Sequence, residues 1–200
     1  GILTATYLFG LRIYFDFAGY SLIALGLAKM LGIRLTLNFR APYAARSLRE
    51  FWHRWHVTLS NWFRDYVYFP LGGSRGPFWA LNLMIVFTVS GLWHGAGWTF
   101  VFWGGLHGLY LCVNHGWQTW CRHAGWQFTQ RRSWQPVAWA ITFGAVLIGW
   151  VYFRASSFVV ANSIVASMFG LNGFDLQVKP SNQILYVLAV LAAAMWLPNT

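Results

Sequence analysis

The chain has 200 residues, of which 58% are hydrophobic, 20% are aromatic and only 9% are charged. Soluble domains carry about 25% charged residues, so the composition excludes an ordinary water-soluble globule. The formal net charge of +10 does not indicate a nucleic-acid partner. The basic residues flank apolar stretches, which is the pattern expected where Lys and Arg collect in the cytoplasmic loops of a membrane protein.

Several apolar stretches are about as long as a segment must be to cross or enter a hydrocarbon core of about 30 Å. Helices satisfy their own backbone hydrogen bonds in lipid, whereas isolated strands do not. The sequence therefore predicts an all-α fold, a polytopic membrane bundle with interfacial and re-entrant helices. The chain begins and ends next to apolar stretches without a leading methionine, which favours a fragment of a longer protein.

The first predicted span covers residues 1–30 and contains two charged residues, Arg12 and Asp16. A charged side chain at the centre of a membrane helix costs about 2.5–3.5 kcal/mol on insertion scales, and it usually faces a partner or a water-filled cavity. The two residues are four apart and share one helix face. They are expected to neutralise each other, or else to line a substrate path.

Residues 31–77 form a basic segment, which is expected to face the cytoplasm. Within it, helical spacing at about 100° per residue predicts one amphipathic helix over residues 50–66. The aromatic residues, including Trp52, fall in one arc, and this arrangement favours a helix at the membrane interface. The polar residues fall in the opposite arc and include Ser60, Arg64 and Asp65.

His56 falls on the border between the two arcs of this helix. It is either an interfacial ring with one edge in water, or a ring that presents one nitrogen to a buried pocket. His53 lies three residues earlier, but two histidines without a nearby carboxylate or cysteine are a weak indication of a metal site. We therefore predict no metal site.

Residues 78–113 contain two apolar runs of about 15 residues, shorter than the ~20 needed to span fully. The turn between them reads WHGAG and contains Trp93 and His94. The following residues, 114–135, are again basic and are predicted to form a cytoplasmic loop. A short-armed hairpin is expected, with His94 in a pocket within the membrane, because irregular backbone at that depth must be buried or line a cavity.

The rest of the chain is predicted to contain a span over residues 136–153, an outer loop with a short interfacial helix over 154–182, and the start of a last span over 183–200. His107, in the run WGGLHGLY, is expected to be a packing residue. The glycines of that run, Gly104, Gly105 and Gly108, would permit close helix packing.

The surroundings of His94 bear on its chemistry. Desolvation disfavours the imidazolium, so a histidine at this depth is expected to be neutral at pH 7. A neutral imidazole is a competent general base, worth about 10² to 10⁴ in rate. From the residues alone, a catalytic and a structural role for His94 both stay open.

Two long motifs carry a resemblance to a known family. FWHRWHVTLSNWFRDYVYFPLGGSRG (residues 51–76) and LNLMIVFTVSGLWHGAGWTFVFWGGLHGLY (residues 81–110) strongly resemble the membrane-bound O-acyltransferase family. The resemblance is strongest to the bacterial branch with the alginate O-acetylation and teichoic-acid D-alanylation membrane proteins. It implies transfer of an acyl group, here acetyl, through a tunnel to a hydroxyl on the outer side. The implied donor is acetyl-CoA or an acyl-carrier thioester on the cytoplasmic side.

The resemblance also implies roles for two histidines. The family's histidine in WHG corresponds to His94, which implies a general base, and its histidine in RWH corresponds to His56, which implies a residue that orients or stabilises groups in the tunnel. The residues expected to line or support the tunnel are Asp16, Trp52, Ser60, Arg64, Asp65 and Trp93.

The same resemblance implies a multi-pass protein of the cell inner membrane, without a permanently bound cofactor. Its implied partners are membrane lipid, the acyl donor and extracytoplasmic acyltransferase proteins, and its acceptor is a polysaccharide or a relay protein. The alternative is a non-catalytic transport or scaffold subunit of a polysaccharide export or modification complex.

Overall fold

The computed structural model describes residues 2–126, 131–173, 189–190 and 192. Within this part the regular elements are helices, so the all-α prediction is confirmed. In chain order these elements are α1 (Ile2–Met30), the short 3-10 helix η1 (Pro42–Ala44), α2 (Leu48–Arg54), α3 (Val57–Phe63), the π-helix η2 (Arg64–Tyr68), α4 (Trp79–His94), α5 (Trp98–His123), the short 3-10 helix η4 (Arg132–Trp134), α6 (Gln135–Arg154) and α7 (Phe158–Met168).

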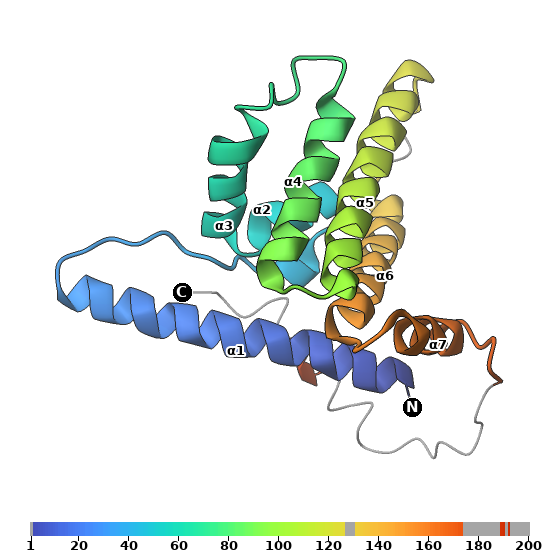
Figure 1. Ribbon diagram of the computed structural model, residues 1–200, viewed down its shortest axis with the longest axis horizontal. Coiled ribbons are helices and arrows are strands. Elements are labelled where there is room, and N and C mark those ends of the chain that lie inside the picture. The colour runs from blue at the N-terminus through green and yellow to red at the C-terminus, as the bar shows by residue number, and fades with distance from the viewer. Residues whose placement is uncertain (1, 127–130, 174–188, 191, 193–200) are drawn as a thin grey trace.

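Helices α4, α5 and α6 stand side by side, and α1 and α7 lie across their foot (Figure 1). α1 and the stretch Arg132–Arg154 are long and apolar enough to cross a membrane, which agrees with the predicted spans over residues 1–30 and 136–153. α7 matches the short helix expected after the second span. The last predicted span, over residues 183–200, falls almost wholly outside the described residues.

The α4–α5 hairpin is packed through glycines that let the two backbones touch. A Cβ atom added at Gly104 would lie 3.1 Å from the Cα of Gly91 and deep within contact distance of the Phe87 carbonyl oxygen. At Gly108 it would lie 2.9 Å from the sulfur of Met84. The expected close packing is therefore confirmed at Gly104 and Gly108, as in membrane helix pairs joined through small residues.

An aromatic core joins the segment before α3 to the bundle. Its buried rings include Tyr14, Tyr43, Phe51, Trp55, Trp103 and Trp150. Tyr43 in η1 donates to the carbonyl oxygen of Gly10 in α1 and accepts, at its own carbonyl oxygen, a 2.8 Å hydrogen bond from the indole of Trp139 in α6. Tyr43 thus ties α1 to α6 and holds η1 and α2 against them.

Helix α5 extends well beyond its expected end at residue 113. The prediction of a loop from residue 114 is wrong as far as His123. Polar side chains in this stretch bond to one another one helical turn apart, which supports the exposed helix. Gln118 donates to the side chain of Asn114 at 3.2 Å, and Arg122 donates to Thr119 at 3.1 Å. The hairpin therefore has one short arm of 16 residues and one long arm of 26 residues.

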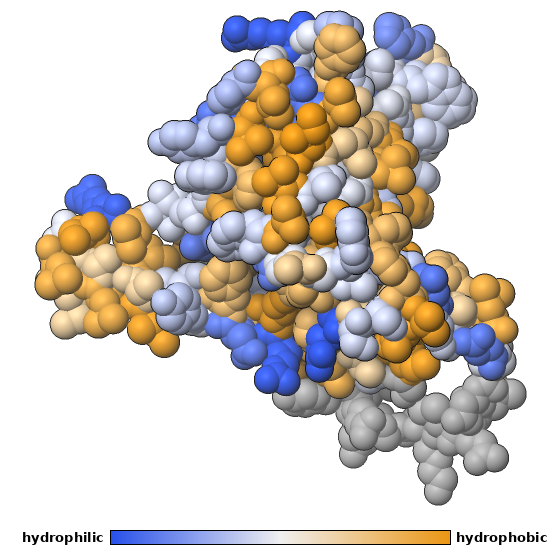
Figure 2. Space-filling view, viewed as in Figure 1, coloured by the Kyte–Doolittle hydropathy of each residue, from blue (hydrophilic) through white to orange (hydrophobic). Residues whose placement is uncertain are grey.

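Much of the surface of the bundle is apolar. Figure 2 shows hydrophobic side chains exposed over the upright helices and over α1, with strongly hydrophilic side chains both at the end of the bundle where α5 ends and around α1 at its foot. Exposed apolar area on this scale is unusual for a soluble monomer and is typical of surfaces that face lipid or another helix. The surface thus agrees with a membrane bundle.

Candidate active site

The basic segment contains a break between two short helices, and this break forms part of the candidate site. The single helix predicted over residues 50–66 is wrong, because α2 ends at Arg54 and α3 begins at Val57. An earlier extended segment satisfies both helix ends at the break: the amide of Arg40 donates to the carbonyl oxygen of Arg54, and the carbonyl oxygen of Asn38 accepts from the amide of Val57, each at 3.0 Å. Tertiary hydrogen bonds thus replace the helical ones that the break removes.

His56 stands at this break in a rare backbone conformation. Its φ of 44° and ψ of 56° are left-handed, a region that costs a non-glycine residue about 1–2 kcal/mol. Its Nδ1 atom is buried and has no hydrogen-bond partner among the described residues. A strained histidine with an unpaired buried nitrogen is typical of a functional site, where the surrounding structure holds the strain in place.

His94 is the last residue of α4 and is half-buried. Its ring makes edge contacts with the rings of Trp93, Trp103 and Phe153, at centroid distances of 4.9, 5.2 and 5.3 Å. The indole nitrogen of Trp103 is also buried without a hydrogen-bond partner in the described part of the chain. His94 therefore lies in an aromatic pocket formed by α4, α5 and α6.

An electrostatic effect links the two histidines, which are 38 positions apart in the chain. Burial lowers the pKa of His56 to about 4, and the charge of His94 in its protonated form also lowers it. Their rings pack against different side chains: His56 against Phe17 and Phe39, and His94 against Trp103 and Phe153. That the two histidines act together stays a prediction.

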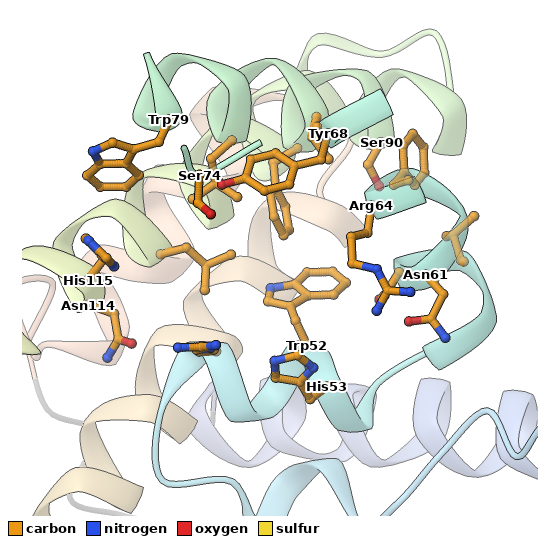
Figure 3. Close-up of a pocket in the computed structure, with 18 of the residues that line it drawn as sticks. Trp52, His53, Asn61, Arg64, Tyr68, Ser74, Trp79, Ser90, Asn114 and His115 are labelled. Atoms are coloured by element: carbon orange, nitrogen blue, oxygen red, sulfur yellow. The ribbon is translucent and has the colours of Figure 1, made fainter. Parts of the chain in front are cut away.

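A cavity of about 490 Å³ runs along α4 between α2, α3, η2 and α5 (Figure 3). Its α4 lining extends from Trp79 to Ser90, about 16 Å along the helix axis, and Ser90 is one helical turn before His94. Arg49, His53 and Arg64 also line it. The cavity thus combines two cationic side chains, Arg49 and Arg64, with a lining that approaches His94.

The predicted tunnel residues fall into two sets. Trp52, Ser60 and Arg64 line the cavity, and the hydroxyl of Ser60 donates to the carbonyl oxygen of Trp55 at the helix break. Asp65 and Asp16 do not line it.

The two aspartates and Trp93 lie outside the cavity lining. Asp65 pairs with Arg64 at 2.7 Å, and Asp16 pairs with Arg12 at 3.4 Å on an exposed face of α1, as expected for mutual neutralisation. Trp93 contacts the ring of His94 and is otherwise largely exposed.

The π-helix η2 orients two residues of the cavity wall. The amide of Phe69 donates to the carbonyl oxygen of Arg64, five residues earlier, and Arg64 and Tyr68 both line the cavity. Single π-turns occur frequently at functional sites. The spacing of residues 64–68 in the sequence contained no sign of this turn.

His107 supports the cavity wall from behind. It is fully buried, and its Nδ1 accepts a 3.3 Å hydrogen bond from the indole nitrogen of Trp52. A Cβ atom at Gly149 in α6 would lie 2.5 Å from its Nε2, so the ring fills the space between α2 and α6. The expectation of a packing role for His107 is confirmed, and its packing fixes Trp52.

Sequence reasoning missed several residues of the site. Ser90 lies four residues before His94, so helical spacing alone placed it on the same face. Trp103 lies in the same motif as His94. Phe153 contacts His94 from α6, and no pattern in the sequence connected the two. Among the described residues, no group of three or more His, Cys, Asp or Glu side chains is arranged to hold a metal ion.

Comparison with known proteins identifies the family. The model of a family described as membrane-bound O-acyltransferase matches residues 2–158. The chain belongs to the membrane-bound O-acyltransferase family. The matched range includes both histidines and the whole of the cavity lining.

Relatives of this membrane-bound O-acyltransferase chain include proteins named for the transfer of acetyl or D-alanyl groups. It is 41% identical to a peptidoglycan O-acetyltransferase of Helicobacter pylori over 84% of this chain and 31% of that protein. It is 43% identical to a probable alginate O-acetylase, AlgI, of Pseudomonas putida, over 82% of this chain and 33% of the relative. A teichoic acid D-alanyltransferase of Bacillus subtilis is 30% identical over 79% of this chain and 42% of that protein. The chain spans about a third of the length of the first two relatives.

The low pKa of His56 predicts how acid affects this membrane-bound O-acyltransferase. Below pH 6.5 the unfolded imidazole takes up a proton, whereas the folded ring stays neutral until the pH reaches about 4. Because the unfolded state binds more protons, stability is expected to fall as the pH is lowered through this window. His56→Gln should remove this part of the decline in the full-length protein, measured as apparent melting temperature against pH.

The matched control is His123→Gln, which changes an exposed histidine at the end of α5. This variant should keep the acid-side decline of the unmodified protein. If His56→Gln gives the same decline as His123→Gln, then the neutral state of His56 does not contribute to acid sensitivity.

Proposed function

We propose that this chain forms the reaction chamber of a membrane O-acyltransferase in the cell inner membrane. The enzyme moves an acyl group, acetyl in the simplest case, from a cytoplasmic thioester to a hydroxyl of an extracytoplasmic polysaccharide or relay protein. The observation that carries this proposal is a cavity with Arg49 and Arg64 in its lining, whose α4 wall reaches Ser90, one helical turn before His94. His94 and His56 lie outside the lining itself.

The donor enters the cavity from its basic side. Arg49 and Arg64 line the cavity together with His53, and their charges contribute to the lowered pKa of His53 after burial, its main cause. Such a cluster attracts the phosphates of acetyl-CoA or of an acyl-carrier thioester. Val86 and Phe87 make the wall beyond it apolar, which suits the uncharged thioester end of the donor.

The transfer needs one base and an orienting group. The neutral imidazole of His94 takes the proton of the acceptor hydroxyl while that oxygen attacks the carbonyl carbon of the thioester. The new ester C–O bond forms, the C–S bond breaks, and the departing thiolate receives the proton from the imidazolium. His56, whose buried Nδ1 has no hydrogen-bond partner among the described residues, orients the reacting groups.

The class of acceptor follows from the relatives. Those named above are a peptidoglycan O-acetyltransferase, a probable alginate O-acetylase and a teichoic acid D-alanyltransferase, whose names describe polymers of the bacterial envelope. A multi-pass arrangement would carry the acyl group across the membrane to such a polymer. Extracytoplasmic acyltransferase partners would then receive it at the outer end of the chamber.

Blocking the cavity tests this proposal. Val86 is buried and lines the cavity on α4, so Val86→Trp in the full-length protein is expected to fill the passage and reduce transfer at least about tenfold, equivalent to about 1.4 kcal/mol. The measurement is transfer of radiolabelled acetyl from acetyl-CoA or an acetylated carrier to the envelope polymer in isolated membranes.

Val113→Trp is the matched control, because Val113 is exposed on α5 and does not line the cavity. This variant should transfer acetyl at the normal rate. Full transfer by a normally folded Val86→Trp protein would show that the donor does not use this cavity.

A further inference from the structure

A second cavity lies at the junction of α1, α6 and α7, and it shares no lining residue with the first. Its volume is about 580 Å³. α6 leaves the basic end of the bundle at Gln135 and ends at Arg154, so this cavity lies at the opposite end of the bundle.

Two arginines line this cavity, Arg12 from α1 and Arg154 from α6. The guanidinium of Arg154 lies 5.6 Å from the ring centroid of Phe9, and no carboxylate in the described part of the chain lies within ion-pair distance of it. Asp16 pairs with Arg12, but both side chains are largely exposed and their separation is 3.4 Å. Asp16 thus offsets the charge of Arg12, and the charge of Arg154 is the one in this lining that the described residues leave uncompensated.

The rest of the wall is mostly apolar. Leu8 on α1, Val151 on α6, and Val160 and Ile164 on α7 all line it. α7 continues this apolar surface outwards, since Val159 is 80% exposed and Phe158 is also exposed. A cationic part and an apolar wall in one cavity match a ligand with an anionic head and hydrocarbon chains.

We propose that this cavity binds an anionic phospholipid. The phosphate lies between Arg12 and Arg154, where guanidinium groups can donate paired hydrogen bonds to its oxygens. The acyl chains follow the apolar surface of α1 and α7. Basic pockets between membrane helices bind lipid headgroups by the same chemistry.

The shared chemistry of the ligand is a phosphate, which a lipid or a soluble phosphate compound could supply. The apolar wall favours the lipid, because a soluble phosphate would leave that surface without a partner. The site is independent of the acyl-transfer chemistry, since His94 and His56 do not line it.

The test uses the delipidated full-length protein and native mass spectrometry. Phosphatidylglycerol is expected to be retained about fivefold more than zwitterionic phosphatidylethanolamine, and Arg154→Gln and Arg12→Gln are each expected to lower that retention about fivefold. Arg122→Gln changes an arginine in the last turn of α5, outside this cavity. It is the matched control and should retain phosphatidylglycerol normally. Millimolar inorganic phosphate should not displace the lipid.

A second variant separates lipid binding from a loss of folding. Val160→Trp fills the cavity and keeps both arginines, so it should lower retention in a protein with a normal size-exclusion profile. Equal retention of the two lipids, normal retention by Arg154→Gln or Val160→Trp, or displacement by inorganic phosphate would each overturn the proposal. None of these readouts depends on ester formation, so the outcome leaves the proposed function untouched.

Discussion

Replacing His94 with glutamine in the full-length protein is expected to lower ester formation by about 10² to 10⁴. Glutamine keeps a polar group of similar reach at the end of α4 but cannot accept and return a proton near neutral pH. The half-buried ring is held by aromatic contacts from Trp103 and Phe153, so the base has a defined position. The measurement is the ester content of the surface polysaccharide, together with transfer of labelled acetyl in isolated membranes.

The matched control for this variant is His123→Gln. His123 is the last residue of α5 as His94 is the last residue of α4, but it is exposed and far along the other arm of the hairpin. Its replacement should leave ester content normal. Normal esters with His94→Gln at an unchanged protein level would favour the transport or scaffold alternative, because such a subunit has no need of a base at this position.

Gly104→Ala is expected to destabilise the full-length protein by about 3 kcal/mol, at the upper end of the range for overpacked cores. The added methyl group would meet the backbone of Phe87 and of Gly91, and backbone atoms cannot turn aside as the end of a side chain can. The two arms of the hairpin would have to separate, which would displace His94 as well. The apparent melting temperature in detergent should fall by several degrees.

Gly105→Ala is the control for this change, because it makes the same substitution one residue later on α5. Its Cβ atom would lie 3.9 Å from the hydroxyl of Thr88, an ordinary contact. Alanine is also the better helix former by about 1 kcal/mol, so this variant should be as stable as the unmodified protein or slightly more stable. A Gly104→Ala protein as stable as Gly105→Ala would mean that α4 and α5 can separate without loss of stability.

The sequence was sufficient to predict the parts of the fold that depend on local pattern. The apolar lengths predicted α1 and α6, and the WHGAG turn predicted a hairpin with His94 at its bend. The expected neutralisation of Arg12 by Asp16 followed from helical spacing and is confirmed. These features depend on residues near one another in the chain, which is why pattern alone was enough.

Features that depend on distant residues were beyond the sequence pattern. The break at His56 requires Asn38, eighteen positions earlier, to accept the hydrogen bond of Val57, and nothing in the amphipathic pattern of residues 50–66 indicated it. The contact between Phe153 and His94 likewise joins the end of a predicted span to the turn of the predicted hairpin, and the sequence did not indicate how the two pack. The polar end of α5 was predicted as a loop because its hydropathy is low, although its helical hydrogen bonds form in water.

The unequal arms of the hairpin have a consequence for the membrane around the protein. Trp117 and Trp120, exposed near the end of α5, belong at headgroup depth, and Trp98 at its start is about 28 Å from Trp117 along the helix axis. In the proposed orientation, with the end of α5 on the cytoplasmic side, the length of α5 sets the distance from the cytoplasmic headgroups to the bend that carries His94, whatever the thickness of the bilayer. Thicker membranes would then bury the bend further from outer water, and thinner ones would bring it closer. Under the proposed function, lipid chain length would control acceptor access without any change in the protein.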